Sequence, residues 1–232
     1  MQIGDPEGAR HLALALKDAQ VVESTDGGIT LRLQAVGDLT VTSGSVVACD
    51  PKWLEEAPQP FLTHIEPGRY PVILSIAHFP DGDQRVAYTT LRFRERQPVR
   101  WKVARRQEDD ADGDIYASAY SVDSGKGCFM DADLLHLLVE RIAAEAADET
   151  IYECMNIGPG YEEGIDEVMA RTRVRTWGWA NICPEPDTTS NVIVFSSGLG
   201  DGAYLTYVGY DADAVPVCFT TDFALFEDES EE

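Results

Sequence analysis

Short runs of alternating apolar and polar residues recur along this 232-residue chain, and they constrain its fold more than any other feature. Ile29, Leu31 and Leu33 alternate with polar residues, a period of two that is typical of a half-buried strand. Gly, Pro and Asp separate the runs and are typical of turns. Strands are expected at 29–33, 39–42, 46–49, 70–79, 85–94, 99–103, 115–122, 191–196, 203–210 and 215–223. The pattern predicts a fold dominated by antiparallel strands.

One helix stands out among the predicted strands. Asp131 is a capping residue, and leucines follow it at helical spacing in the range 132–147. Shorter helices are expected near 6–18 and 161–171. The predicted class is therefore α+β, a mostly antiparallel, sandwich-like sheet structure with one main helix. Since no linker divides the chain, we expect one globular domain over 1–226 and a disordered acidic tail over 227–232.

The charge of the chain is strongly negative. It has 41 Asp and Glu against 18 Lys and Arg, a formal net charge of −23. Such a field repels phosphate backbones and anionic membrane surfaces, and it attracts basic protein surfaces. We therefore expect no nucleic-acid or membrane partner and a basic protein as the partner. The alternative is that the charge serves solubility alone.

The expected compartment is the cytoplasm. No basic and apolar leader pattern is visible, and no apolar run approaches the ~20 residues of a membrane-spanning helix. The five cysteines are widely spaced and form no C-x-x-C pair. This pattern predicts reduced thiols, most of them buried.

Three aspartates at predicted turns, Asp123, Asp131 and Asp201, are the candidate catalytic residues. If they cluster, they could hold a metal or share a proton in a small hydrolase. The interpretation we favour is that each carboxylate accepts hydrogen bonds from its own turn. Common zinc and serine-hydrolase motifs are missing, so we expect no metal or cofactor and lean away from an enzyme. The acidic run 108–114 lacks a bidentate Glu at Ala119, which excludes an EF-hand.

The remaining candidates are a glycine-rich segment and a group of aromatic residues. The segment 196–202 resembles a phosphate loop in composition only, because the residues after it are predicted to form a strand rather than a helix. We therefore predict a β-hairpin connection whose glycines serve the backbone. The candidate binding residues are Trp177, Trp179, Asp201 and Tyr204, although paired tryptophans more often close a core.

Five motifs together resemble one bacterial family. They are G-S-V-V-A-C-D-P at 44–51, P-G-R-Y-P-V at 67–72, Y-S-V-D-S-G-K-G-C-F-M-D at 120–131, S-G-L-G-D-G-A-Y at 197–204 and T-D-F at 221–223. Their order and spacing are similar to those of the domain of unknown function 4241 family. The resemblance implies a β-rich bacterial cytoplasmic protein without an established activity. Some relatives in this family are encoded near polymorphic toxin systems, and the resemblance therefore also implies an immunity-type role.

The functional hypothesis from the sequence is a non-enzymatic acidic binding protein, with an immunity-like inhibitor of a basic protein as its specific form. The alternative is a small hydrolase or metal-dependent enzyme using the clustered aspartates.

Overall fold

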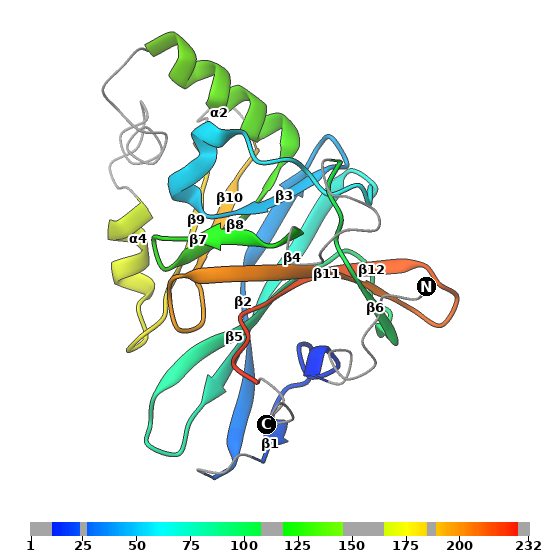
Figure 1. Ribbon diagram of the computed structural model, residues 1–232, viewed down its shortest axis with the longest axis vertical. Helices are drawn as coiled ribbons and strands as arrows, with labels where there is room; N and C mark the ends of the chain where they lie inside the picture. Colours follow the sequence, from blue (N-terminus) through cyan, green and yellow to red (C-terminus); the bar gives the residue numbers. More distant parts are fainter. Residues whose placement is uncertain (1–10, 24–26, 108–117, 146–164, 185–188, 227–232) are drawn as a thin grey trace.

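The computed structural model describes residues 11–23, 27–107, 118–145, 165–184 and 189–226 (Figure 1). The expected short helix at 6–18 falls partly within these ranges, and residues 11–16 form a helical turn there. The acidic run 108–114 and the predicted tail 227–232 lie outside the described residues. None of the helices within the described part of the chain is long and apolar enough to cross a membrane.

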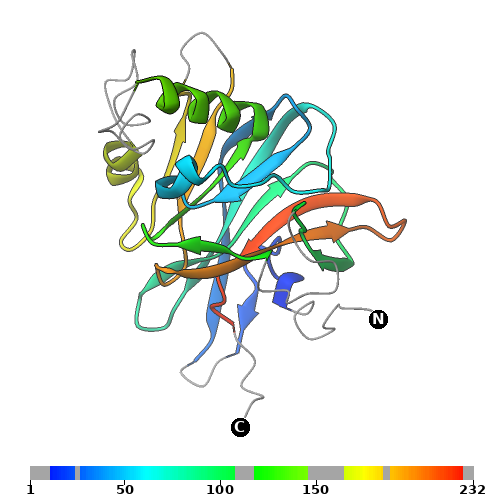
Figure 2. The ribbon, with the colours of Figure 1, turned by 45° about the horizontal axis from the view of Figure 1, so that its top comes forward.

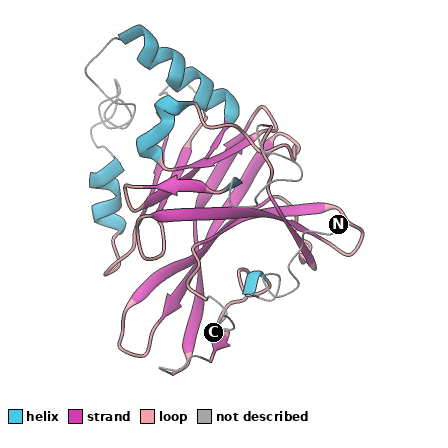
Figure 3. Ribbon diagram, viewed as in Figure 1, coloured by secondary structure: helices cyan, strands magenta, loops and turns pink. Residues whose placement is uncertain are grey.

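A large antiparallel sheet contains most of the predicted strands (Figure 3). Its order is β1-β2-β4-β5-β12-β11-β6, and β7 pairs with a further part of β11. The bounds are β1 Val21–Val22, β2 Ile29–Val41, β4 Gly68–His78, β5 Gln84–Arg92, β6 Arg100–Val103, β7 Tyr120–Val122, β11 Gly202–Tyr210 and β12 Pro216–Asp222. The predicted β-rich α+β class is therefore confirmed.

A second antiparallel sheet of four strands lies between the large sheet and the helices (Figures 1 and 2). Its order is β3-β8-β10-β9, with bounds β3 Val46–Cys49, β8 Lys126–Asp131, β10 Val192–Ser196 and β9 Trp179–Ile182. The helical elements on its outer side are the 3-10 helix η1 Pro51–Glu56, α2 Ala132–Glu145 and α4 Ile165–Thr172. The predicted helices near 132–147 and 161–171 are thus present.

Strand β3 contributes side chains to both apolar layers of the protein, the one between the two sheets and the one between the small sheet and the helices. Val46 and Ala48 point into the core shared with the large sheet, whereas Val47 and Cys49 pack with residues of the helices. All four residues of β3 are buried. Full burial of one large aliphatic side chain stabilises a fold by roughly 1.5–3 kcal/mol. The small sheet therefore contributes to two apolar layers at once.

Three local predictions need correction. Strand β2 is one 13-residue strand with a register shift between Ala35 and Gly37, where the sequence suggested two segments. Strands β8 and β9 were not predicted, and β8 begins at Lys126, only three residues after the turn predicted at Asp123. The segment between β10 and β11 is not a hairpin, because these two strands belong to different sheets. It crosses from the small sheet to the large one.

The cysteines follow the prediction for the described residues. Cys49, Cys128 and Cys218 are buried, Cys183 is exposed, and all four are free thiols. The Sγ atoms of Cys49 and Cys128, which face each other on β3 and β8, lie 3.6 Å apart. Burial raises the pKa of the Cys218 thiol to about 12. Such thiols react slowly in the native protein.

Candidate functional site

Two glycine-containing loops, 123–125 before β8 and 197–201 before β11, lie against each other. The Gly125 amide donates to Oδ1 of Asp201 at 3.1 Å, and the Ser197 amide donates to the Gly125 carbonyl at 3.1 Å. These two bonds join segments that are about seventy residues apart in the chain. The loops therefore form one unit at the edge where the two sheets meet.

The side chain of Asp50 holds the 123–125 loop in place through hydrogen bonds. Asp50 directly follows β3 and is 1% exposed. Its Oδ2 accepts from the Asp123 and Ser124 amides, both at 2.8 Å. Its Oδ1 accepts from the Lys52 amide at 2.8 Å and from the Ser124 hydroxyl at 2.6 Å. One buried carboxylate thus caps η1 and shapes the loop before β8.

Backbone conformation explains the glycines of the second loop. Gly198 has φ +48° and Gly200 has φ +116°, the left-handed region that favours glycine. A Cβ on Gly198 would lie 2.7 Å from Cβ of Phe223. The Gly200 carbonyl accepts from the Ser197 and Tyr204 hydroxyls at 2.9 and 2.8 Å. The prediction that these glycines serve the backbone is confirmed, because a strand, β11, follows them.

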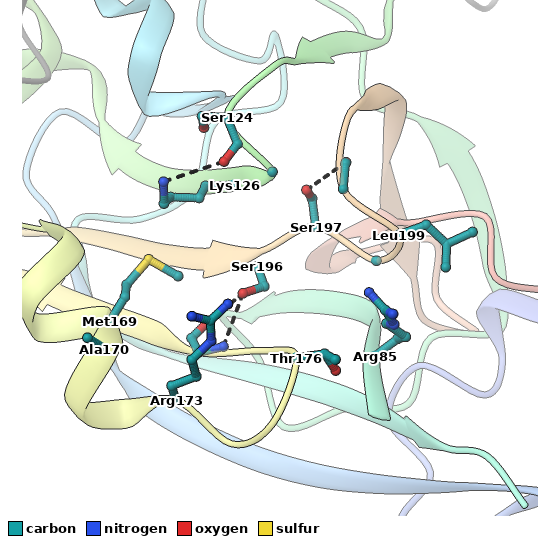
Figure 4. Close-up of a pocket in the computed structure, with 14 residues that line it drawn as sticks. Arg85, Ser124, Lys126, Met169, Ala170, Arg173, Thr176, Ser196, Ser197 and Leu199 are labelled. Atoms are coloured by element: carbon teal, nitrogen blue, oxygen red, sulfur yellow. Dashed lines mark hydrogen bonds between the residues drawn. The ribbon is translucent and has the colours of Figure 1, made fainter. Parts of the chain in front are cut away.

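A pocket of about 410 Å³ opens beside the joined loops (Figure 4). Its 14 lining residues come from both loops, from the strands β5, β8 and β10, and from the end of α4 and the segment after it. Three of them are cations, Arg85, Lys126 and Arg173, and no carboxylate is among the described residues that line it. Figure 4 shows these side chains placed around Ser196 and Ser197.

Sequence reasoning missed this pocket entirely. The three basic residues come from widely separated parts of the chain, and only Lys126 lies within one of the five family motifs. The loops themselves were recognised as glycine-rich, but each was considered alone. Only the contact between Gly125 and the 197–201 loop reveals that they form one site.

The structure separates the three candidate catalytic aspartates. Asp123 and Asp201 both belong to the joined loops, and Asp123 pairs with Lys52 at 2.5 Å. This hydrogen bond is the main reason that the pKa of Lys52 is raised. Asp131 ends β8 and so lies at the opposite end of that strand. Within the described ranges, no group of three or more His, Cys, Asp or Glu is placed to hold a metal.

Asp131 has a structural environment of its own. It is fully buried and accepts from the amides of Thr42 and Ser43 at 2.9 and 3.0 Å, and also from both of their hydroxyls. The Asp133 amide donates to Oδ1 at 3.0 Å, which confirms the predicted cap of α2. Asp131 therefore ties the turn after β2 to the start of the helix.

The aromatic candidates face the interior. The rings of Trp177 and Trp179 are stacked with centroids 5.8 Å apart. Trp177 is 6% exposed, and its indole N–H donates to Oε1 of Gln84 at 3.2 Å. Tyr204 is also buried and contacts Phe223 edge to face. None of these three side chains lines the pocket.

The fold and the site define a β-rich α+β protein with a small, cation-lined pocket between two sheets. Residues 39–221 match the family model described as Protein of unknown function (DUF4241), so the chain belongs to this family. No curated protein matches the chain. No solved structure matches it either.

Proposed function

We propose that this protein is a non-enzymatic, acidic binding protein that engages a basic protein partner, as an immunity-like inhibitor does. The observation that carries the proposal is the uneven distribution of charge along the chain. The six segments outside the described ranges contain 20 of the 41 carboxylates but only one of the 18 basic residues, Arg10. The described residues, with 21 carboxylates and 17 basic residues, are close to balance.

Two of these segments concentrate the charge most. Residues 108–114 contain five carboxylates and no basic residue, and residues 227–232 have the same count. Segments of one sign of charge raise the rate of encounter with an oppositely charged protein and contribute to its selection. We assign recognition of the basic partner to these two segments.

The positions of the aspartates support this proposal over the hydrolase alternative, and the thiols support the predicted compartment. A hydrolase that uses paired carboxylates needs them on either side of the bond that breaks. Asp131 lies away from Asp123 and Asp201, and its oxygens already accept five hydrogen bonds. The free thiols of Cys49 and Cys128, only 3.6 Å apart, support a reducing, cytoplasmic location.

The test compares charge-neutralised variants of equal size. One variant converts the five carboxylates of 108–114 to amides, and a second treats 227–232 in the same way. The control neutralises five exposed carboxylates of the described part that accept no hydrogen bond there: Glu23, Asp38, Glu56, Glu66 and Glu95. A partner isolated from the native source is identified and then titrated against all four proteins by calorimetry.

We expect a basic partner that binds with one-to-one stoichiometry and weakens with salt. At least one segment variant should bind about tenfold more weakly or worse, and the control should change much less. A neutral or acidic partner would contradict the proposal. So would equal weakening by all three variants, because net charge alone would then account for binding.

A further inference from the structure

We propose that the pocket beside the joined loops is a binding site for the phosphate group of a small phosphomonoester. The chain is acidic overall, yet its 14 pocket-lining residues include three basic and no acidic ones. The described residues, from which the pocket is built, contain 21 acidic and 17 basic residues, so a lining with three basic and no acidic residues departs from their near balance. The local reversal of charge points to an anionic ligand.

The three cations approach from separate elements. Arg85 comes from β5, Lys126 from the first position of β8, and Arg173 from the residue after α4. Arg173 is exposed, and no carboxylate among the described residues pairs with it. Arginine and phosphate form strong, charge-assisted hydrogen bonds, often two at once. Arg173 is therefore the principal candidate contact.

Arg85 is held in place by a neighbour. Its Nε donates to Oδ2 of Asp83 at 2.8 Å, which leaves the two terminal nitrogens of the guanidinium outside that bond. Hydrogen bonding to Arg85 is the main reason that the pKa of Asp83 is lowered. Asp83 reduces the positive charge that Arg85 contributes to the pocket, but it also fixes the orientation of the terminal guanidinium nitrogens of Arg85. The arrangement suits a bidentate contact to an oxyanion.

The loop before β11 adds neutral donors. Positive φ at Gly198 and Gly200 turns the backbone sharply, and such turns can present consecutive amides to an anion. Among the described residues, no acceptor is found for the amides of Gly198 or Leu199. By contrast, the pocket hydroxyls are engaged, since Ser124 donates to Asp50 and Ser197 donates to Gly200. The donors left for a ligand are Arg173, the terminal nitrogens of Arg85 and the backbone amides.

The volume of the pocket indicates a ligand larger than a free phosphate ion. About 410 Å³ lies within the range of ordinary small-molecule pockets. Met169, Ala170 and Leu199 form apolar parts of the wall and suit an organic group attached to the phosphate. The site differs from a phosphate loop because no helix begins at the glycines, and the cations replace the helix dipole.

Calorimetric titration of the full chain at low ionic strength tests the proposal. Inorganic phosphate and ribose 5-phosphate are the two probes, with ribose as the uncharged control. We expect ribose 5-phosphate to bind more tightly than phosphate, and ribose not to bind. Arg173→Gln should weaken binding about tenfold or more, because one charge-assisted contact is lost.

The matched control is Arg69→Gln, an exposed arginine outside the pocket that removes the same charge. It should change the affinity less than twofold. Thermal unfolding of each variant without ligand shows that it is folded. Absence of binding by both anions in the wild type would overturn the proposal, as would equal weakening by Arg173→Gln and Arg69→Gln. Phosphate that binds as tightly as the ester would overturn the phosphomonoester assignment.

Discussion

The two ends of the β3–β8 strand pair use the same chemistry for different purposes. Since these strands are antiparallel, Asp50 after β3 and Asp131 at the end of β8 lie at opposite ends of the pair. Each carboxylate is almost fully buried, and each accepts hydrogen bonds from two separate segments of the chain. The Asp131 end closes onto the helix α2, whereas the Asp50 end opens into the loops that border the pocket.

The difference between the two ends shows how the 123–125 loop beside the pocket keeps its conformation. At the Asp131 end, the donors are the turn after β2 and the first turn of the helix α2, neither of which lines the pocket. At the Asp50 end, the donors include the exposed loop at 123–124. The carboxylate there transfers the rigidity of the sheet to a loop that reaches solvent. The comparison predicts that one aspartate governs stability and the other governs both stability and the pocket.

The largest effect is expected at Asp131. Asp131→Ala removes the acceptor of the Thr42 and Ser43 amides and hydroxyls and also removes the helix cap. Loss of the cap alone costs about 1 kcal/mol. Together with the four hydrogen bonds from Thr42 and Ser43 that are lost, we expect a decrease of about 4 kcal/mol in the free energy of unfolding.

Urea denaturation of the wild type, Asp131→Ala and the neighbouring Asp133→Ala measures this loss. Asp133 is exposed, so its replacement should cost less than about 1 kcal/mol. Equal losses for both variants would show that Asp131 is only a helix cap. Asp131→Asn, which retains one acceptor oxygen, should fall between them.

Asp50→Ala should cost somewhat less, about 3 kcal/mol, because Asp50 accepts four hydrogen bonds whereas Asp131 accepts five. Unlike any change at Asp131, it should also weaken binding of ribose 5-phosphate. Calorimetry on the folded fraction of Asp50→Asn and Asp131→Asn provides the comparison. If both variants bind the ester as tightly as the wild type does, Asp50 has no role in shaping the pocket.

Gly198→Ala should reduce stability by about 2 kcal/mol, because the new Cβ meets the side chain of Phe223 and φ is positive. Gly200 also has positive φ, but nothing lies within 4 Å of its Cβ position. Gly200→Ala should therefore cost only about 1 kcal/mol. Thermal unfolding of both variants separates steric overlap from backbone strain, and the reverse order would refute this account of Gly198.

The smallest effect is expected for the ion pair at the rim. Lys52 and Asp123 are 44% and 54% exposed, so water screens their interaction. Lys52→Ala should leave the free energy of unfolding almost unchanged, and urea denaturation measures this. A loss comparable to that of Asp50→Ala would mean that the side chain of Asp123, and not Asp50, holds the loop.

The large sheet was predictable from the sequence, and the small one was only partly so. Strands such as β2 face the core on one side, so their residues alternate between apolar and polar types. Strand β8 is buried on both faces, and its sequence Lys-Gly-Cys-Phe-Met-Asp shows no alternation. Gly127 and the preceding Asp123 are residue types typical of loops, so the sequence did not indicate a strand here. Strand β9 has only four residues, and in the sequence this segment drew attention only through the paired tryptophans Trp177 and Trp179.

The candidate site was predictable only in its parts. Both glycine loops were recognised, and the helix cap formed by Asp131 was predicted, but within the described residues Asp201 accepts from Gly125 of the other loop and not from its own turn. Asp123 differs, because its side chain pairs with Lys52 while its amide binds Asp50. The convergence of Arg85, Lys126 and Arg173 depends on the crossing from one sheet to the other, which no local pattern encodes. Contacts between distant segments decide such sites.

The stacked tryptophans have an optical consequence. Two indole rings 5.8 Å apart couple their electronic transitions, so Trp177 and Trp179 should produce a paired circular-dichroism signal in the native state. Thr176 and Gly178, which line the pocket, are sequence neighbours of these rings. The molecule therefore contains its own spectroscopic reporter beside the pocket, and occupancy of the site should be visible without any added label.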